Sequence, residues 1–258
     1  MLEGRAVLVA GGAGAIGEGV VGQLAEAGAE VVVPSRTQDR LVALEARVKA
    51  AASTALKRRF AGPVAPIRGY VGHVGEVEAA AVLRDTIAAD LAETGAAGGL
   101  DAVVSLVGGW WSGSPLAEVR LDEWDLQLHR SLRAHQVVAS TFVPLLRGRE
   151  GARYTLVTGD SAEEPAAGAG LSSVFSAGAL MTGRVLAVEE AAHGVAVDTL
   201  VLGPVITRSR PQGPERWLTA TEVGQVIVAR LAAGEPGAVI AIPDRAAADA
   251  LTGAGPAG

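Results

Sequence analysis

Residues 6–17 read AVLVAGGAGAIG, an apolar run followed at once by a turn rich in glycine. The run has no polar side chain, as in a strand buried on both faces of a parallel sheet. In the turn, Gly11 permits a tight bend, Gly14 lets a diphosphate approach the backbone, and Gly17 lets helix and strand pack closely. Free N–H groups at the helix N-terminus would hold the diphosphate. The stretch therefore predicts a nucleotide-binding unit; the alternative is a glycine turn that packs tightly and binds nothing.

Apolar runs and segments of helical periodicity alternate along the rest of the chain. Further strands are predicted at residues 30–34, 67–74, 101–107, 154–158, 195–202 and 238–242, and helices at 15–27, 41–56, 76–91, 121–146, 171–192 and 221–232. This alternation predicts an α/β fold, a Rossmann-type doubly wound parallel sheet with helices on both faces. We expect a single dinucleotide-binding domain over residues 1–258, in which residues 252–258 form a flexible tail.

Composition narrows the classes of partner. The net charge of −6 disfavours a nucleic-acid or anionic-membrane surface. The absence of cysteine excludes disulfides and thiolate metal sites, and no His/Asp/Glu spacing suggests another metal site. The N-terminus shows no export signal, and no uncharged apolar run approaches the roughly 18 residues that a membrane helix needs. We expect a cytoplasmic protein that binds a small organic ligand and no metal.

The residue at the end of the second predicted strand distinguishes NAD from NADP in folds of this type. An acidic residue there would hold the ribose hydroxyls of NAD. This chain has Pro34-Ser35-Arg36 instead, and a guanidinium can form a fork to a 2′-phosphate. Arg36 therefore favours NADP over NAD; the alternative is an ordinary surface arginine.

These features resemble the short-chain dehydrogenase/reductase family over nearly the whole chain. Further motifs similar to the family's are GHV at 72–74, SLVG at 105–108, WD at 124–125 and LGPVIT at 202–207. His73 stands where the family has an adenine-binding aspartate. The resemblance implies an NADP(H) site made by Gly11, Gly12, Gly14, Ala15, Ile16, Gly17, Arg36, His73, Val74, Val107, Gly108, Gly203, Val205 and Thr207.

The same resemblance locates the family's catalytic serine, tyrosine, lysine and asparagine. Anchored on RVLAVE at 184–189, these positions fall at Gly159, Ser172, Ser176 and Ser131, respectively. The family's tyrosine donates a proton to the substrate carbonyl, and its lysine lowers the pKa of that tyrosine. A serine hydroxyl is too weak an acid at neutral pH to replace this pair without a strong base.

No Tyr-x-x-x-Lys pair can be written anywhere in the chain. The tyrosines are Tyr70 and Tyr154, and the lysines are Lys49 and Lys57. The resemblance therefore implies an atypical member of the family, in which ordinary reductase catalysis is not expected.

Other side chains could supply chemistry or shape a pocket. Asp160 is a weak acid/base candidate, although a solvated loop shared with Glu163 and Glu164 is the favoured interpretation. His129 and His135 are expected to face solvent or a partner subunit. Trp110 and Trp111 follow the fourth strand, and Trp217 lies in the segment that forms the family's substrate lid. These tryptophans could line an apolar substrate pocket, or they could cap the core or an interface.

Three hypotheses follow. The first is an NADP(H)-binding protein that is catalytically altered, and that performs non-redox chemistry on a small ligand or serves as a partner or sensor subunit. The second is an NADPH-dependent carbonyl reductase with a non-standard proton donor, either Asp160 or water. The third is a structural pseudoenzyme that pairs with an active paralogue. The resemblance implies a homodimer or homotetramer formed through the helices at 121–146 and 171–192, with a hetero-oligomer as the alternative.

Overall fold

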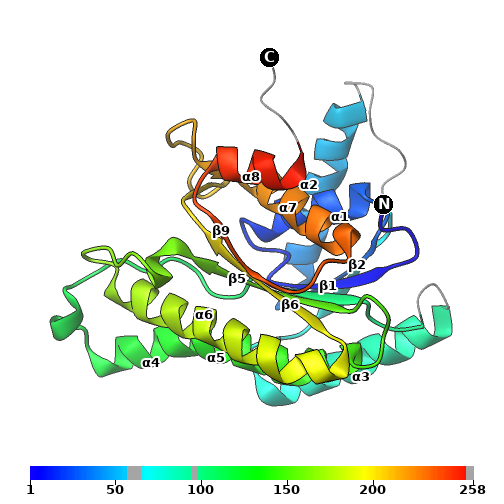
Figure 1. The fold of residues 1–258 in the computed structure, drawn as a ribbon, viewed down its shortest axis with the longest axis horizontal. Coiled ribbons are helices and arrows are strands. Elements are labelled where there is room, and N and C mark those ends of the chain that lie inside the picture. The colour runs from blue at the N-terminus through cyan, green and yellow to red at the C-terminus, as the bar shows by residue number, and fades with distance from the viewer. Residues whose placement is uncertain (57–64, 95–97, 254–258) are drawn as a thin grey trace.

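The computed structural model describes residues 1–56, 65–94 and 98–253. Its centre is a seven-stranded sheet in the order β3-β2-β1-β4-β5-β6-β9, and every neighbouring pair of strands is parallel. Helices cover both faces of this sheet (Figure 1). The predicted Rossmann-type α/β fold is thereby confirmed. The strands of the sheet are β1 (Ala6–Ala10), β2 (Glu30–Ser35), β3 (Ile67–Val71), β4 (Ala102–Ser105), β5 (Arg153–Gly159), β6 (Ala196–Leu202) and β9 (Val239–Ile242).

Two groups of helices pack on opposite faces of the sheet (Figure 1). One group consists of α1 (Gly17–Glu26), α2 (Gln38–Leu56), α7 (Ala220–Ala233) and α8 (Arg245–Thr252). The other consists of α3 (Val77–Thr94), α4 (Leu121–Arg130), α5 (Leu132–Phe142) and α6 (Gly170–Glu190). Single 3₁₀ turns occur at Leu116–Glu118, Val143–Leu146, Asp160–Ala162 and Ala191–His193.

β1 shows why these residues form a central strand. Side chains alternate across a strand, so Val7 and Val9 enter the apolar core under α1 and α7, while Leu8 enters the core under α3 and α5. All five residues of β1 are buried. A strand that is apolar at every position is stable where both faces of the sheet are covered, so residues 6–10 suit the centre of the sheet.

The predicted continuous helix at 121–146 was wrong. The backbone leaves the helical region at Ser131 (φ −120°, ψ −93°), so α4 ends there and α5 begins at the next residue. The apolar periodicity continues across this one-residue break, so no periodic signal marks it. The break places Ser131 at the wall of the pocket described below.

The C-terminal region also differs from expectation. Residues 245–252 form α8, so Thr252 closes a helix rather than opening a tail, and residues 254–258 lie outside the described residues. A short parallel pair, β7 (Val205–Ile206) with β8 (Leu218–Thr219), brackets the segment between β6 and α7 and was not predicted. The helical stretch Gly170–His193 is long and apolar enough to cross a membrane by length and composition. It packs on β5 and β6, as a core helix of an α/β fold does.

A buried ionic cluster ties together the amino ends of the last strands. Asp198 on β6 is fully buried, and its carboxylate accepts hydrogen bonds from Arg153 Nη1 at 2.7 Å and Arg230 Nη2 at 3.1 Å. The backbone N–H of Ala238 donates to it at 3.0 Å. One carboxylate thus joins β5, β6, α7 and the entry to β9.

Candidate functional site

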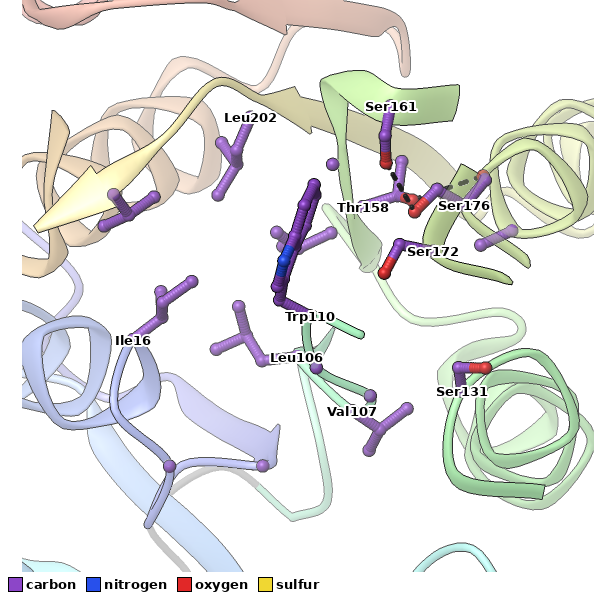
Figure 2. A pocket seen from close by; sticks show the side chains of 18 of the residues that line it. Ile16, Leu106, Val107, Trp110, Ser131, Thr158, Ser161, Ser172, Ser176 and Leu202 are labelled. Atoms are coloured by element: carbon purple, nitrogen blue, oxygen red, sulfur yellow. Dashed lines mark hydrogen bonds between the residues drawn. The ribbon is translucent and has the colours of Figure 1, made fainter. Parts of the chain in front are cut away.

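A pocket of about 460 Å³ lies at the carboxyl ends of β1, β4, β5 and β6 (Figure 2). The strand order reverses between β1 and β4, and ligands of doubly wound sheets bind in the crevice at such a point. The structure brings most of the residues singled out from the sequence to this pocket. They are Gly11, Gly14, Ala15, Ile16, Gly17, Val107, Gly108, Trp110, Trp111, Ser131, Gly159, Asp160, Ser172, Ser176, Gly203, Val205 and Thr207.

Five of the candidate residues do not line this pocket. Gly12 packs against Val33, and His73 accepts a hydrogen bond from the Gly75 N–H at its own Nδ1. The others are Val74, which packs on the core beneath α3, Arg36, which is exposed, and Trp217, which lies under the guanidinium of Arg210 at 5.5 Å. The sequence analysis also missed several lining residues, notably Leu106, His135, Thr158, Ser161, Phe175 and Arg210.

The glycine turn has little room for side chains. Gly11 has φ +88°, and a Cβ there would lie 2.6 Å from the Leu106 carbonyl oxygen. A Cβ on Gly17 would lie 2.3 Å from the Gly11 carbonyl oxygen. Gly14 is different, because its Cβ would meet only the Gly11 oxygen, at 2.9 Å. Gly11 and Gly17 are therefore needed for the turn itself, while Gly14 presents bare backbone to the pocket.

The start of α1 fits a diphosphate. No side chain caps this helix at Ile16. Within the described part of the chain, the backbone amides of Ala15, Ile16 and Gly17 donate no hydrogen bond. Unpaired amides at a helix N-terminus attract anions, because the helix dipole adds to their positive charge. The residues present thus suit the phosphates of a dinucleotide.

Four arginines gather beside this turn, although the sequence analysis named only Arg36. Arg40 Nη2 donates to the Ala13 carbonyl oxygen at 3.4 Å. Burial lowers the pKa of Arg40, and the positive charges of Arg36, Arg208 and Arg47 lower it further, so these three guanidinium groups lie within electrostatic reach of Arg40.

One carboxylate partly balances this arginine cluster, defined as Arg36, Arg40, Arg47 and Arg208. Glu18 Oε2 accepts from Arg47 Nε at 2.8 Å and from Arg208 Nη1 at 3.0 Å. The cluster keeps an excess of positive charge, which suits a dianionic phosphate. Arg208 comes from the segment after β7, so no local sequence pattern could have placed it here.

Ser172 is fully engaged with the loop that follows β4. Its Oγ accepts from the Trp111 N–H at 2.7 Å and donates to the Trp111 carbonyl at 2.9 Å. The side chain of Trp111 is also fixed, since its Nε1 donates to Glu123 Oε1 at 2.7 Å. The hydroxyl at position 172 therefore anchors backbone and has no proton to give to a ligand.

Most of the other small hydroxyls lie on the same wall as Ser172 (Figure 2). Ser176 Oγ lies 3.5 Å from Ser161 Oγ, and Thr158 Oγ1 donates to the Ser176 carbonyl at 3.2 Å (Figure 2). Ser131 Oγ donates to the Gln127 carbonyl. These groups can orient a polar ligand by hydrogen bonding, but none of them is paired with a base.

The tyrosines and the described lysine lie away from the pocket. Tyr154 is buried within β5, and burial raises the pKa of its phenol further above the usual value. Tyr70 donates to Asp90 Oδ2 at 2.8 Å, and Lys49 pairs with Glu45 on α2. None of these three residues lines the pocket, and Lys57 lies outside the described residues. Among the described residues, no group of His, Asp and Glu could hold a metal ion.

Asp160 is the acidic group of the pocket wall. Burial raises the pKa of its carboxyl, and the negative charge of Glu164 raises it further, against hydrogen bonds from local backbone that lower it. The expected solvated loop holds for Glu163 and Glu164, which are exposed, whereas Asp160 is half-buried. Asp160 therefore keeps its proton to a higher pH than an exposed aspartate does.

His135 contradicts the expectation that it faces solvent or a partner, whereas His129 is exposed. His135 is only 4% exposed, and its Nδ1 lies 2.9 Å from Ser105 Oγ at the end of β4. Burial lowers its pKa to about 4. The signal was present in the sequence, because Val138 and Phe142 follow His135 at helical spacing and mark the buried stripe of α5.

We expect His135 to make the fold less stable as the pH falls. The unfolded chain gains a proton at this histidine near pH 6.5, while the folded chain stays neutral to about pH 4. As the pH falls from 6.5 to about 4, the free energy of unfolding therefore decreases by up to about 1.4 kcal/mol per pH unit. Urea unfolding between pH 7 and 4.5 should show a shallower pH slope in His135→Gln than in the wild type. His129→Gln on α4 should keep the wild-type slope; equal slopes in all three proteins would contradict this assignment.

Comparisons with known proteins agree with the fold described above. A family model described as short chain dehydrogenase matches residues 5–215. The human protein "Dehydrogenase/reductase SDR family member 2, mitochondrial" is 28% identical over 211 residues, which cover 80% of this chain and 67% of that protein.

Two solved structures share the fold. A short chain dehydrogenase from Burkholderia cenocepacia J2315, in complex with NADP, is 23% identical with a TM-score of 0.71, covering 93% of this chain and 97% of that one. A short chain oxidoreductase from Pseudomonas aeruginosa PAO1, described as containing an atypical catalytic center, is 23% identical with a TM-score of 0.73. That match covers 93% of this chain and 96% of the other.

Proposed function

Because this chain belongs to the short-chain dehydrogenase family, we propose that it binds NADP(H) and is catalytically altered. It acts on a small organic ligand by non-redox chemistry, such as isomerisation, dehydration or ring closure, or it serves as a partner or sensor subunit. The observation that carries this proposal is the engagement of Ser172. The family resemblance assigns the proton-donating tyrosine to position 172. There the serine hydroxyl makes two hydrogen bonds to the backbone of Trp111.

The cofactor half of the proposal rests on charge and on free donors. The amides of Ala15, Ile16 and Gly17 would hold the diphosphate. The arginine cluster would hold the 2′-phosphate that distinguishes NADP from NAD. NADPH supplies a hydride donor when it is bound, and the related Burkholderia protein has been solved with NADP.

The catalytic part of the proposal rests on which side chains line the pocket wall. Ser131, Gly159, Ser172 and Ser176 occupy the positions where the family resemblance expects the catalytic groups. The hydroxyls of Ser131 and Ser172 donate to backbone carbonyls, and that of Ser176 accepts from Ser161. These serines can therefore position a ligand but cannot deliver a proton at neutral pH. The Pseudomonas protein with an atypical catalytic center supports the idea that this fold accommodates such changes.

A second candidate function is favoured by Asp160. A carboxyl group that lines the pocket with a raised pKa could donate the proton that a carbonyl reductase requires. A third, the structural partner of an active paralogue, is supported by apolar side chains that α6 exposes at Met181, Val185 and Val188. The same surface would serve a homodimer or homotetramer.

Two measurements test the proposal. Calorimetry should show NADPH binding at least about 10-fold more tightly than NADH, and Arg36→Ala should remove most of that preference. Arg120→Ala, at the exposed residue just before α4 that pairs with Asp122, should keep this preference. Absorbance at 340 nm should stay constant when NADPH-loaded protein meets a panel of aldehydes and ketones.

The alternatives give different results. Rapid, saturable oxidation of NADPH that disappears in Asp160→Asn would establish the second candidate and overturn the first. Absence of NADPH binding to the wild type would leave only the structural partner, which should then co-purify with its paralogue.

A further inference from the structure

We propose that the indole of Trp110 stacks on the nicotinamide ring of bound NADP(H). The indole would fill the space beside the ring and would not itself donate a proton. This inference rests on the proposed function and concerns the part of the coenzyme far from the arginine cluster. It is carried by the position of Trp110, by the anchoring of the loop that bears it, and by the character of the surrounding wall.

Trp110 stands in the middle of the pocket. Its indole projects from the loop after β4 between two walls, with Ile16 and Leu202 on one side and Thr158 and Ser172 on the other (Figure 2). The side chain is 57% exposed although it lines the pocket, so one of its faces is available to a ligand. A large aromatic group held open in this way is an unusual use of apolar surface and indicates a ring-shaped ligand.

The backbone beside Trp110 is held at several points. The next residue, Trp111, bonds to Ser172 through both its N–H and its carbonyl, and Gly113 N–H donates to the Gly168 carbonyl at 2.8 Å. On the other side, Gly108 adopts φ +104°, a conformation that favours glycine. These constraints direct the indole into the pocket, so that its orientation depends mainly on its own side-chain torsions.

Trp110 is the aromatic side chain best placed to meet a ring that enters from the glycine turn. Among the described lining residues, the other tryptophan, tyrosine or phenylalanine rings are those of Trp111 and Phe175. The Nε1 of Trp111 donates a hydrogen bond to Glu123. Phe175 packs edge-on against Trp124, with the ring centroids 4.9 Å apart. An electron-rich indole stacks favourably on an electron-poor cationic ring, which describes oxidised nicotinamide.

The stack would also explain the small residue at position 172. Ser172 carries no ring that competes with Trp110 for space, and its hydroxyl holds the neighbouring residue in place. An indole on the open face of the nicotinamide keeps a carbonyl substrate from that face. Trp110 is therefore a coenzyme-contacting residue whose effect is to retain the coenzyme rather than to promote its turnover.

The test compares two ligands that differ in the nicotinamide. NADP⁺ carries the ring, whereas adenosine 2′,5′-bisphosphate has the 2′-phosphate and no nicotinamide. Trp110→Ala should weaken NADP⁺ binding by roughly 10-fold in calorimetry, as loss of one stacked ring does, and should leave adenosine 2′,5′-bisphosphate unaffected. NADP⁺ should also quench tryptophan fluorescence in the wild type, and Trp110→Ala should abolish most of that quenching.

Two further variants complete the design. Trp110→Phe should recover most of the affinity lost in Trp110→Ala, because a phenyl ring still stacks, while the quenching stays lost. Trp124→Phe, which removes a tryptophan outside the pocket lining, should keep both the affinity and the quenching.

Other outcomes overturn the inference. Equal loss of both ligands in Trp110→Ala would mean that Trp110 supports the fold of the pocket, and unchanged NADP⁺ affinity would mean that it does not touch the ring. Both results leave NADP(H) binding intact as a proposal. Failure of the wild type to bind NADP⁺ at all would overturn both proposals together.

Discussion

Replacing Gly14 with alanine is expected to weaken NADPH binding by about two orders of magnitude while the protein stays folded. The added Cβ would meet one atom, the Gly11 carbonyl oxygen at 2.9 Å, so the backbone of the turn must shift, and thermal unfolding reports the cost of that shift separately from binding. The methyl group would nevertheless stand on the surface that a diphosphate must approach, beside the free amides of α1. A 100-fold loss corresponds to about 2.7 kcal/mol of binding free energy. Calorimetry with NADPH measures the loss, and thermal unfolding checks the fold.

The matched control is Gly22→Ala in α1, the helix that follows the turn. A Cβ at Gly22 would meet no atom within 4 Å, so alanine should stabilise α1 by about 0.5–1 kcal/mol and leave NADPH binding unchanged. Gly17 is unsuitable for this comparison, because its Cβ would lie 2.3 Å from backbone and disrupt the turn. Full NADPH affinity in Gly14→Ala would show that the coenzyme does not lie on the glycine turn.

Asp198→Asn is expected to destabilise the fold by about 3–5 kcal/mol, the largest effect on stability that we anticipate for a single substitution. Asparagine has nearly the same shape, so no cavity forms, but the negative charge is lost. Arg153, which is 3% exposed, would then keep its positive charge without a full counter-charge in the protein interior, and Arg230 would lose the same partner. Urea unfolding followed by circular dichroism measures the change.

An exposed aspartate serves as the control for this substitution. Asp85 pairs with Arg84 on the surface of α3, and Asp85→Asn should leave the urea midpoint where it is, because solvent screens such pairs. Comparable losses in Asp85→Asn and Asp198→Asn would mean that the buried cluster has no special role in holding the strands together.

The fold could be predicted from the sequence because its strongest signals, an apolar strand and a glycine turn, each lie within a few consecutive residues. The buried strand β1 begins and ends at the predicted residues, and the glycine turn needs only its own spacing to be recognised. Strands β2 to β6 were found with shifted ends: β3, β4 and β6 are shorter than the predicted runs, and β2 and β5 are longer. The break at Ser131 was missed because the apolar stripe of the helix continues across it.

The site was only partly readable, because several of its features join distant segments. Arg208 reaches Glu18 across 190 positions of sequence, and Ser172 reaches Trp111 across 61. No spacing rule predicts such contacts. The sequence could identify Arg36 as a phosphate-binding candidate and Ser172 as an altered position, but it could not show the arginine cluster or the use that Ser172 makes of its hydroxyl.

The pairing of Ser172 with Trp111 limits what a single substitution could do to this pocket. A tyrosine introduced at position 172 would remove both hydrogen bonds that Ser172 makes to the Trp111 backbone, and it would bring a phenol close to Trp110 (Figure 2). Engineering a proton donor into this position would therefore require a second substitution that anchors the loop after β4 in another way.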